Sequence, residues 1–154
     1  MTESAKPSGC TSARLRRLAR ATSRMYDRHL VAAGLKTTQY SVLANAARAD
    51  RPVAELADLL AMDRTTLTRN LKPLIDAGWI ALAPGRDARQ RIVQVTAPGR
   101  AKLREAQRLW RAAQDELESI LGIDTVGLLH AQLDTALATL KPYLEHSHHD
   151  HSDQ

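Results

Sequence analysis

Residues 63–74, DRTTLTRNLKPL, combine cationic and hydroxyl side chains with leucines at helical spacing. Leu67, Leu71 and Leu74 recur at i, i+4 and i+7, so one face of a helix here would be apolar. The other side carries short hydroxyls and long cations with hardly a carboxylate: Arg64, Thr65, Thr68, Arg69 and Lys72. Arginine and lysine donate hydrogen bonds to phosphate oxygens. The sequence therefore predicts a helix that binds a polyanion.

A second group of cations lies in a predicted β-hairpin. Residues 79–83 (WIALA) and 91–96 (RIVQVT) alternate with a period of two, which is typical of short strands, and PGRDARQ joins them. We expect the cations of this hairpin to be drawn to the negative potential of a narrow A·T-rich minor groove. Asp87 is expected to pair with a neighbouring arginine and so to stabilise the hairpin. The cations are Arg86, Arg89 and Arg91.

The elements that must position these residues are mainly helices. Apolar periodicity predicts five helices besides the cationic one. Gly34 and Gly122 are expected to end two of them, and Arg51-Pro52 is expected to break another. Predicted N-caps are Thr37 or Thr38, Asp63, Thr96 and Asp124. The five helices span approximately residues 12–32, 38–49, 53–60, 97–121 and 124–145.

Composition agrees with one domain and a polyanionic partner. The 154 residues are 44% apolar, enough for a core, and carry a formal charge of +5. Six arginines lie in residues 14–28, and nine Lys or Arg against four acids lie in residues 63–105. There is no apolar run long enough for a membrane helix and no signal-peptide pattern, so a cytoplasmic location is expected. The single cysteine agrees with a reducing compartment.

The order of elements predicts a fold class, mainly α with a small β-hairpin wing (α+β). Helix, tight turn, cationic helix and two-stranded hairpin form a winged helix-turn-helix, expected at about residues 37–98. The fourth helix would lie in a major groove, where Arg64 and Arg69 can donate bidentate bonds to guanine. Lys72, Thr65 and Thr68 can bond phosphates or base edges.

Three segments carry a family resemblance. LKTTQYSVL, AELADLLAMDRTTLTRNLKPLIDAGWI and GRDARQRIVQVTAPGRA resemble the multiple-antibiotic-resistance regulator (MarR) family of transcription factors, over roughly residues 15–144. The resemblance implies a homodimer whose first and last helices interlock, at about residues 11–33 and 97–145. It further implies a repressor that leaves a pseudo-palindromic operator when a small phenolic or lipophilic compound, an oxidant or a metal is sensed. Asp87 and Arg89 match the family's Asp-x-Arg wing motif, and the matched recognition-helix positions are Arg64, Thr65, Thr66, Thr68 and Arg69.

Candidate sensor residues lie outside the winged region. Cys10 precedes a predicted helix N-terminus near several arginines, which favours the reactive thiolate. Family members that sense hydroperoxides carry a reactive cysteine early in the first helix. Counted back from Gln39, however, Cys10 lies about two residues before the position of that cysteine. A pocket near the dimer interface, implied by the resemblance, would be lined by Met25, Tyr26, His29 and Tyr40. Taken singly, Met25, Tyr26 and Tyr40 are more typical of core residues on an apolar stripe, whereas His29 fits a core position and a ligand contact equally.

The chain's last residues offer a weaker metal hypothesis. Residues 1–10 and 146–154 are expected to be a flexible arm and a disordered His-rich tail. The histidines of this tail, with Asp150, can bind Zn²⁺ or Ni²⁺ loosely, but a flexible cluster is rarely a selective sensor. No cofactor is predicted. The histidines are His146, His148, His149 and His151.

Two other function classes are alternatives to a regulator. A sequence-tolerant architectural DNA-binding protein would show a steep salt dependence and little preference between sites. An enzyme would need a nucleophile with a base, or paired acids in a cleft, and the carboxylate pairs of this sequence have the spacing of solvated helix faces. The sequence therefore predicts a DNA-binding regulator and no catalytic activity.

Overall fold

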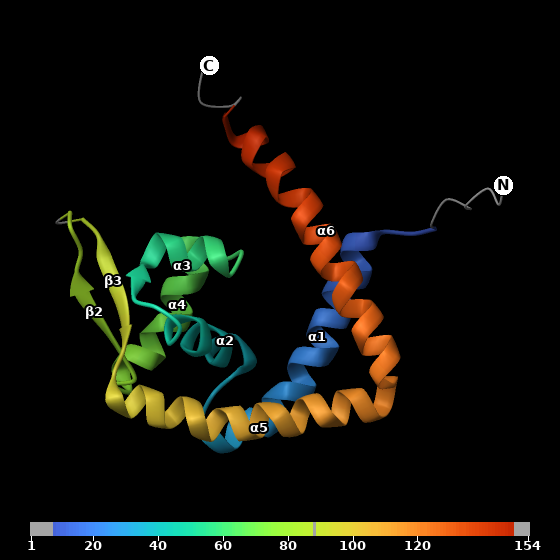
Figure 1. Ribbon diagram of the computed structural model, residues 1–154, viewed down its shortest axis with the longest axis horizontal. Coiled ribbons are helices and arrows are strands. Elements are labelled where there is room, and N and C mark those ends of the chain that lie inside the picture. The colour runs from blue at the N-terminus through green and yellow to red at the C-terminus, as the bar shows by residue number, and fades with distance from the viewer. Residues whose placement is uncertain (1–7, 88, 150–154) are drawn as a thin grey trace. The chain divides into compact units, whose positions relative to one another are not determined.

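The computed structural model describes residues 8–87 and 89–149, with side chains to residue 143 (Figure 1). It divides into two compact units, Met1–Ala113 and Gln114–Gln154. The elements in chain order are α1 (Thr11–Leu30), the 3₁₀ turn η1 (Val31–Ala33), α2 (Thr37–Ala46), β1 (Arg51–Pro52), α3 (Val53–Leu59), α4 (Arg64–Asp76), β2 (Ile80–Pro84), β3 (Arg91–Val95), α5 (Ala97–Leu121) and α6 (Ile123–His149). This is the predicted winged helix class, mainly α with a small sheet.

The sheet has three antiparallel strands in the order β1-β3-β2. β2 and β3 form the predicted hairpin, with Ile80 opposite Val95 and Pro84 opposite Arg91. Arg51-Pro52, expected only to end a helix, also forms the short strand β1, in which Arg51 pairs with Val93. A proline is tolerated here because β1 is an edge strand, where a missing N–H costs no ladder bond.

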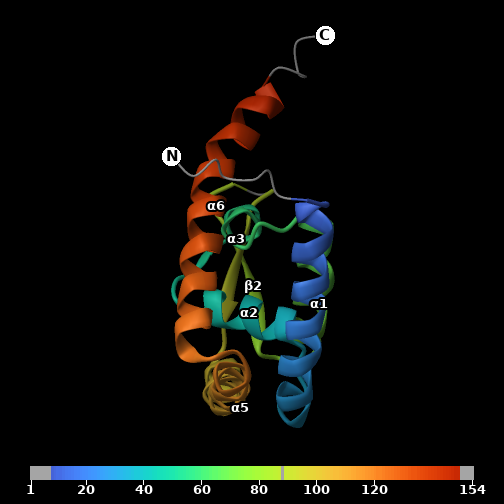
Figure 2. The same ribbon diagram turned by 90° about the vertical axis from the view of Figure 1, so that its right-hand side faces the viewer.

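The core of the first unit lies between the helices and the sheet. The α4 leucines at positions 67, 71 and 74 are 0–3% exposed. They belong to one apolar cluster with residues of α2, α3 and the sheet, among them Leu43, Leu56 and Val93. Figure 2 shows α5 end-on beneath α2. The predicted apolar stripe of α4 is therefore what fixes this helix to the domain.

Local signals fix most of the helix ends. Gly34 and Gly122 both adopt positive φ and end helical segments as predicted. The Thr96 hydroxyl accepts the Gly99 amide at 3.1 Å, which confirms its role as a cap. Two predicted caps were wrong: the N-cap of α2 is Lys36, with Thr37 already helical, and Asp124 lies inside the first turn of α6.

The second unit contains the end of α5 and all of α6. Val126 is the buried apolar side chain of this unit among the described residues, whereas Leu128, Leu137 and Leu140 are 53–67% exposed. The helix continues to His149, so the backbone of residues 146–149 is helical where a disordered tail was expected. Residues 1–7 and 150–154 of the expected arm and tail lie outside the described residues. Within the described chain, no helix has the length and apolarity to span a membrane.

Candidate nucleic-acid interface

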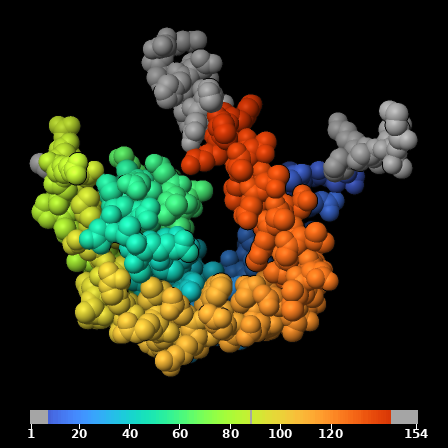
Figure 3. All heavy atoms as spheres, viewed as in Figure 1, coloured from blue at the N-terminus to red at the C-terminus, as the bar shows by residue number. Residues whose placement is uncertain are grey.

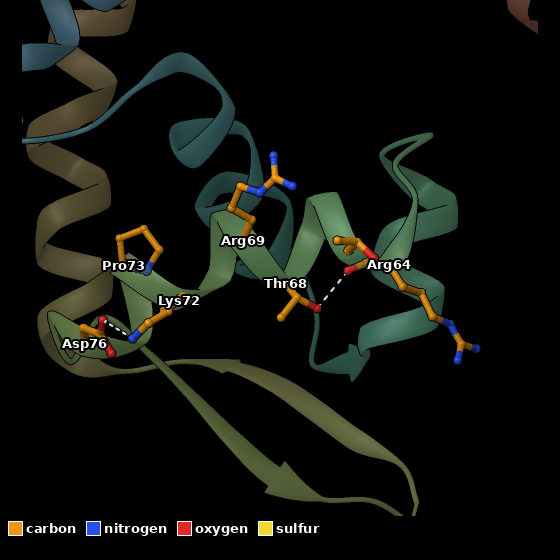
Figure 4. Close-up of a pocket in the computed structure, with 7 residues that line it drawn as sticks. Arg64, Thr68, Arg69, Lys72, Pro73 and Asp76 are labelled. Carbon is orange, nitrogen blue, oxygen red and sulfur yellow. Dashed lines mark hydrogen bonds and ion pairs between the residues drawn. The ribbon is translucent and has the colours of Figure 1, made fainter.

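The outward face of α4 is cationic and open. It lines a groove of about 680 Å³ whose residues are Arg64, Thr65, Thr68, Arg69, Lys72, Pro73 and Asp76. Figure 4 shows the guanidinium groups of Arg64 and Arg69 extended away from the helix. Thr65, Thr68 and Lys72 are also exposed. The structure therefore brings five of the predicted residues to one surface, backed by the buried leucines.

Two hydroxyls of this helix are already engaged locally. The Thr68 hydroxyl donates to the Arg64 carbonyl at 2.8 Å (Figure 4). The Thr66 hydroxyl donates to the Asp63 carboxylate at 2.6 Å, and the Thr66 amide donates to the same carboxylate at 2.8 Å. Thr66 is half-buried. It therefore acts as part of the helix cap and lies off the open face.

Lys72 has a partner that the sequence reading missed. Its ammonium lies 2.8 Å from an Asp76 carboxylate oxygen, and both side chains are well exposed. The i, i+4 spacing on the predicted helix was the available signal. An exposed pair of this kind contributes little to stability. A phosphate can therefore compete with Asp76 for Lys72 without a large cost.

The N-terminus of α4 is capped by Asp63. The side-chain hydrogen bond from Thr66, followed by the Thr66 backbone bond, lowers the pKa of the Asp63 carboxyl below its ordinary value. The tight turn before it contains Ala61 at φ 50°, a left-handed conformation uncommon for a residue other than glycine. Together, turn and cap fix the direction in which α4 leaves α3.

The wing is stabilised by backbone hydrogen bonds. In Figure 3 its tip extends beyond helices α2–α4. The Gly85 amide donates to the Gln90 carbonyl at 3.0 Å, and the Gln90 amide donates to the Asp87 carbonyl at 2.9 Å. The Asp87 carboxylate accepts the Arg89 amide at 3.1 Å. Within the described residues, the Asp87 carboxylate is thus bonded to the backbone of an arginine and not to a guanidinium. The exposed cations of the wing are Arg86, Arg89 and Arg91.

Gln90 is a wing residue that the sequence reading missed. Its side-chain oxygen accepts the Arg86 amide at 3.2 Å, and its backbone closes the turn at both ends. The backbone bonds leave no signal in the residue type, because any residue other than proline can supply them, whereas the side-chain bond needs the amide oxygen of Gln90. Arg86 is held by its backbone, which leaves its side chain exposed.

The candidate sensor residues lie apart from this face. Tyr26 and Tyr40 pack against the apolar core, while Met25 and His29 are half-buried on α1. Tyr40 stacks on Trp110 of α5 with ring centroids 6.1 Å apart. Burial raises the pKa of Tyr40, and the nearby Arg111 guanidinium opposes the shift. Nothing in the sequence signals this aromatic pair, because the two rings come from helices far apart along the chain.

The structure describes Cys10 but not the side chains of the histidines near the C-terminus. Cys10 is exposed at the N-cap position of α1, and its carbonyl accepts the Arg14 amide at 3.2 Å. The side chains of the histidines at 146–149, and residue 151 entirely, lie outside the described residues. Across the residues that are described, no group of three or more His, Cys, Asp or Glu is placed to hold a metal.

The fold and the cationic helix define a winged helix DNA-binding regulator, and comparison with known proteins agrees. Residues 33–90 match the model of the MarR family. The DNA complex of the M. tuberculosis transcriptional regulator MosR is similar over 86% of this chain and 98% of that chain, with 37% identity and a TM-score of 0.74. No curated protein sequence matches significantly.

Two further solved structures are similar. A mutant of E. coli MarR complexed with operator DNA has 26% identity and a TM-score of 0.73, covering 82% of this chain and 92% of that one. The transcriptional repressor CouR, bound to a 23-mer DNA duplex, has 25% identity and a TM-score of 0.75 with the same coverage. This chain belongs to the MarR family of DNA-binding transcriptional regulators, whose members are not enzymes.

Proposed function

We propose that the protein is a homodimeric repressor that binds a pseudo-palindromic operator and leaves it when a small molecule or an oxidant is sensed. The observation that carries the proposal is the open cationic face of α4, anchored by leucines that are at most 3% exposed. A rigidly held helix loses little conformational entropy when it enters a groove. CouR, a similar protein, is a repressor bound to duplex DNA.

In the proposed complex α4 lies in the major groove. Arg64 and Arg69 read guanine edges with bidentate hydrogen bonds, because both guanidiniums extend from the helix (Figure 4). Thr65 and Lys72 contact phosphates, and Thr68 contacts them once its hydroxyl leaves the Arg64 carbonyl. The wing cations, Arg86, Arg89 and Arg91, enter an adjacent minor groove, while Asp87 holds the wing in shape.

The apolar surface of α6 supports the homodimer of this proposal. Leu128, Leu137 and Leu140 are more than half exposed, an unfavourable arrangement for an isolated chain in water. A second copy supplies a matching surface, and a two-fold dimer presents two copies of α4 to two half-sites. Operator symmetry then mirrors protein symmetry. Half-sites centred about one helical turn apart are expected.

Two signals remain as candidates for release of the operator. One is a small phenolic or lipophilic effector near Tyr26 and Tyr40, where the Trp110 ring supplies an aromatic wall. The other is an oxidant acting on the exposed Cys10. The effector site has the stronger support, since it combines aromatic rings with half-buried polar groups, whereas Cys10 is a single thiol at a helix end.

Fluorescence anisotropy tests this proposal with duplexes tiling the DNA upstream of the protein's own gene. We expect one duplex to bind far more tightly than random duplex of equal length at the same salt concentration. Equal affinity for all duplexes with a steep salt slope would instead indicate an architectural protein. Repeating the titration after peroxide, with Cys10→Ser as the control, separates the two signals: loss of binding only in the Cys10 protein indicates an oxidant sensor.

A further inference from the structure

A second cationic surface lies on the outward side of α5. Residues 97–113 contain five Lys or Arg and one carboxylate, Glu105. Four of the cations are arginines at i, i+4, i+8 and i+11, so they share one helix face. At a rise of about 1.5 Å per residue, this row is about 17 Å long. We call it the α5 arginine stripe: Arg100, Arg104, Arg108 and Arg111.

The stripe is open to solvent along its length. All four arginines are exposed. The other side of the helix is buried, with Leu103, Ala106 and Ala113 at 0–8% exposed. Leu103 and Ala106 belong to the core cluster that also contains the α4 leucines. Because α5 is fixed through this apolar side, the stripe faces away from the core.

The one carboxylate of residues 97–113 does not neutralise the stripe. Glu105 accepts a hydrogen bond from the Lys102 ammonium at 2.7 Å. Lys102 itself lies over the Trp79 ring, 5.1 Å from its centroid, and so off the stripe. Within the described part of the chain, Arg104 and Arg108 have no hydrogen-bond or ion-pair partner. The positive charge at the centre of the stripe is therefore left for a partner outside this chain.

The α5 arginine stripe is separate from the cationic face of α4. The groove on that face is lined by α4 residues alone. Both helices turn apolar side chains into one core cluster, so their cationic sides point outward from it. In Figures 1 and 2, α2 lies between α5 and α3, the helix that packs against α4. A duplex that lies against α4 therefore leaves the stripe free.

The chemistry of the stripe fits phosphate better than a protein or a membrane. None of the large apolar side chains exposed in the described chain lies within residues 97–113. A protein interface has an apolar centre, and a membrane-bound helix needs an apolar face. Arginine binds phosphate with bidentate hydrogen bonds. A strand of duplex DNA presents a phosphate about every 3.4 Å along the axis, so a row about 17 Å long spans about five phosphates.

We propose that the α5 arginine stripe binds the phosphate backbone of a second DNA duplex, without reading its sequence, while α4 holds the first. The protein then bridges two DNA segments. This inference rests on the DNA contact of α4 in the proposed function, but not on the homodimer, because each copy carries both surfaces. DNA is the expected polyanion because a copy bound through α4 meets neighbouring DNA at a high effective concentration.

Energy transfer between two labelled duplexes tests the bridge. A donor is attached to the duplex preferred in the anisotropy titration and an acceptor to a random-sequence duplex of equal length, and the full chain is added until the donor duplex is saturated. We expect energy transfer that falls steeply as salt is raised, because phosphate contacts release counterions. Saturated donor duplex without energy transfer at low salt would overturn the second surface alone. Failure of every tiled duplex to bind would instead contradict the proposed function.

The substitutions Arg104→Gln and Arg108→Gln remove the two central charges of the stripe. Arg100 and Arg111 stay unchanged, since Arg100 donates to a backbone carbonyl and Arg111 lies near Tyr40. The affinity for the second duplex is expected to fall by about tenfold to a hundredfold at about 0.1 M salt, and its salt slope by about two. Affinity for the preferred duplex should stay close to that of the wild type. Energy transfer that this variant leaves unchanged would overturn the proposal.

A matched control separates the stripe from net charge. Arg20→Gln with Arg24→Gln removes the same charge, at the same i, i+4 spacing, from exposed positions of α1. This control is expected to retain energy transfer, and circular dichroism checks the folding of both variants. Equal loss in the control would assign the effect to net charge and overturn the α5 surface. A change in the mass of the DNA-free protein, seen by sedimentation for the α5 variant alone, would show that the stripe binds another copy and would overturn it as well.

Discussion

Helices α4 and α6 carry leucines at the same helical spacing, but the two helices bury them differently. Leu67, Leu71 and Leu74 of α4 are 0–3% exposed, whereas Leu137 and Leu140 of α6 are 61% and 53% exposed. Both helices satisfy the same sequence pattern for an amphipathic helix. Periodicity thus indicates that a face is apolar, without indicating which chain buries it.

The polar sides of the two helices differ as well. α4 presents Arg64, Arg69 and Lys72 to solvent, while α6 carries Asp124 and Asp134 and has Lys141 as its one basic residue apart from histidines. The first combination fits a helix held in a domain and turned toward a polyanion. The second fits a helix that still needs an apolar partner. The substitutions Leu67→Ala and Leu137→Ala test this contrast.

The largest effect is expected from truncating a leucine of α4. Leu67→Ala should lower the free energy of unfolding by about 2 to 5 kcal/mol, because it leaves a cavity in a fully buried site. Leu137→Ala should change the unfolding of dissociated chains by less than about 0.5 kcal/mol, since its side chain is exposed. Urea unfolding at low protein concentration measures both.

The two leucine variants should rank in the opposite order when the strength of the dimer is measured. Leu137→Ala is expected to weaken the dimer measured by sedimentation, whereas a correctly folded fraction of Leu67→Ala should not. Equal losses of stability for the two variants would show that Leu137 is buried within its own chain, and the contrast between α4 and α6 would fail.

A smaller effect is expected on the polar side of α4. Arg69→Ala should weaken binding to the preferred duplex by about 1 to 3 kcal/mol and relax base preference, because a bidentate base contact is lost. Lys72→Ala is the matched control, expected to weaken binding to all duplexes similarly if Lys72 contacts phosphate. Anisotropy titrations on preferred and random duplexes measure both. Equal losses on the two duplexes for Arg69→Ala would remove its role as a base reader.

The link between α1 and α2 should contribute less. Asp27→Asn is expected to lower the free energy of unfolding by about 1 to 2 kcal/mol, since the charged acceptor of two short hydrogen bonds from Thr37 is lost. A double-mutant cycle with Thr37→Val by urea unfolding isolates this contact. If the effects of the two substitutions on the free energy of unfolding are additive, the contact between Asp27 and Thr37 contributes nothing. In that case α1 is held by apolar packing alone.

The smallest effect is expected at the cap of α4 and depends on pH. Folding lowers the pKa of Asp63, so its carboxylate stabilises the folded state above the ordinary aspartate pKa of about 4. That contribution is lost as the pH falls through the lower folded-state value. Asp63→Asn can still accept a hydrogen bond but does not titrate. The advantage of the wild type over Asp63→Asn in urea unfolding should therefore vanish in acid, and a constant difference from pH 7 downward would contradict this assignment.

The sequence alone predicted the elements and the face of α4. Leucine spacing, the Asp63 cap and the period of two in residues 79–83 and 91–96 are local signals, and the helices and hairpin follow them. Strand β1 was missed because two residues have no periodicity of their own and pair only when β3 is beside them. The C-terminal end of α6 lies beyond the predicted end at about residue 145, because a polar composition does not by itself end a helix.

Residue types and spacing by themselves determined which side chains share a face, because helical and strand geometry are set by the backbone of a few neighbouring residues. The tertiary structure decided which polar groups remain open. It placed Thr66 in a cap, paired Lys72 with Asp76, turned Asp87 to a backbone amide and stacked Tyr40 on Trp110. These outcomes depend on distances between groups that compete for the same partners, and only the folded arrangement fixes those distances.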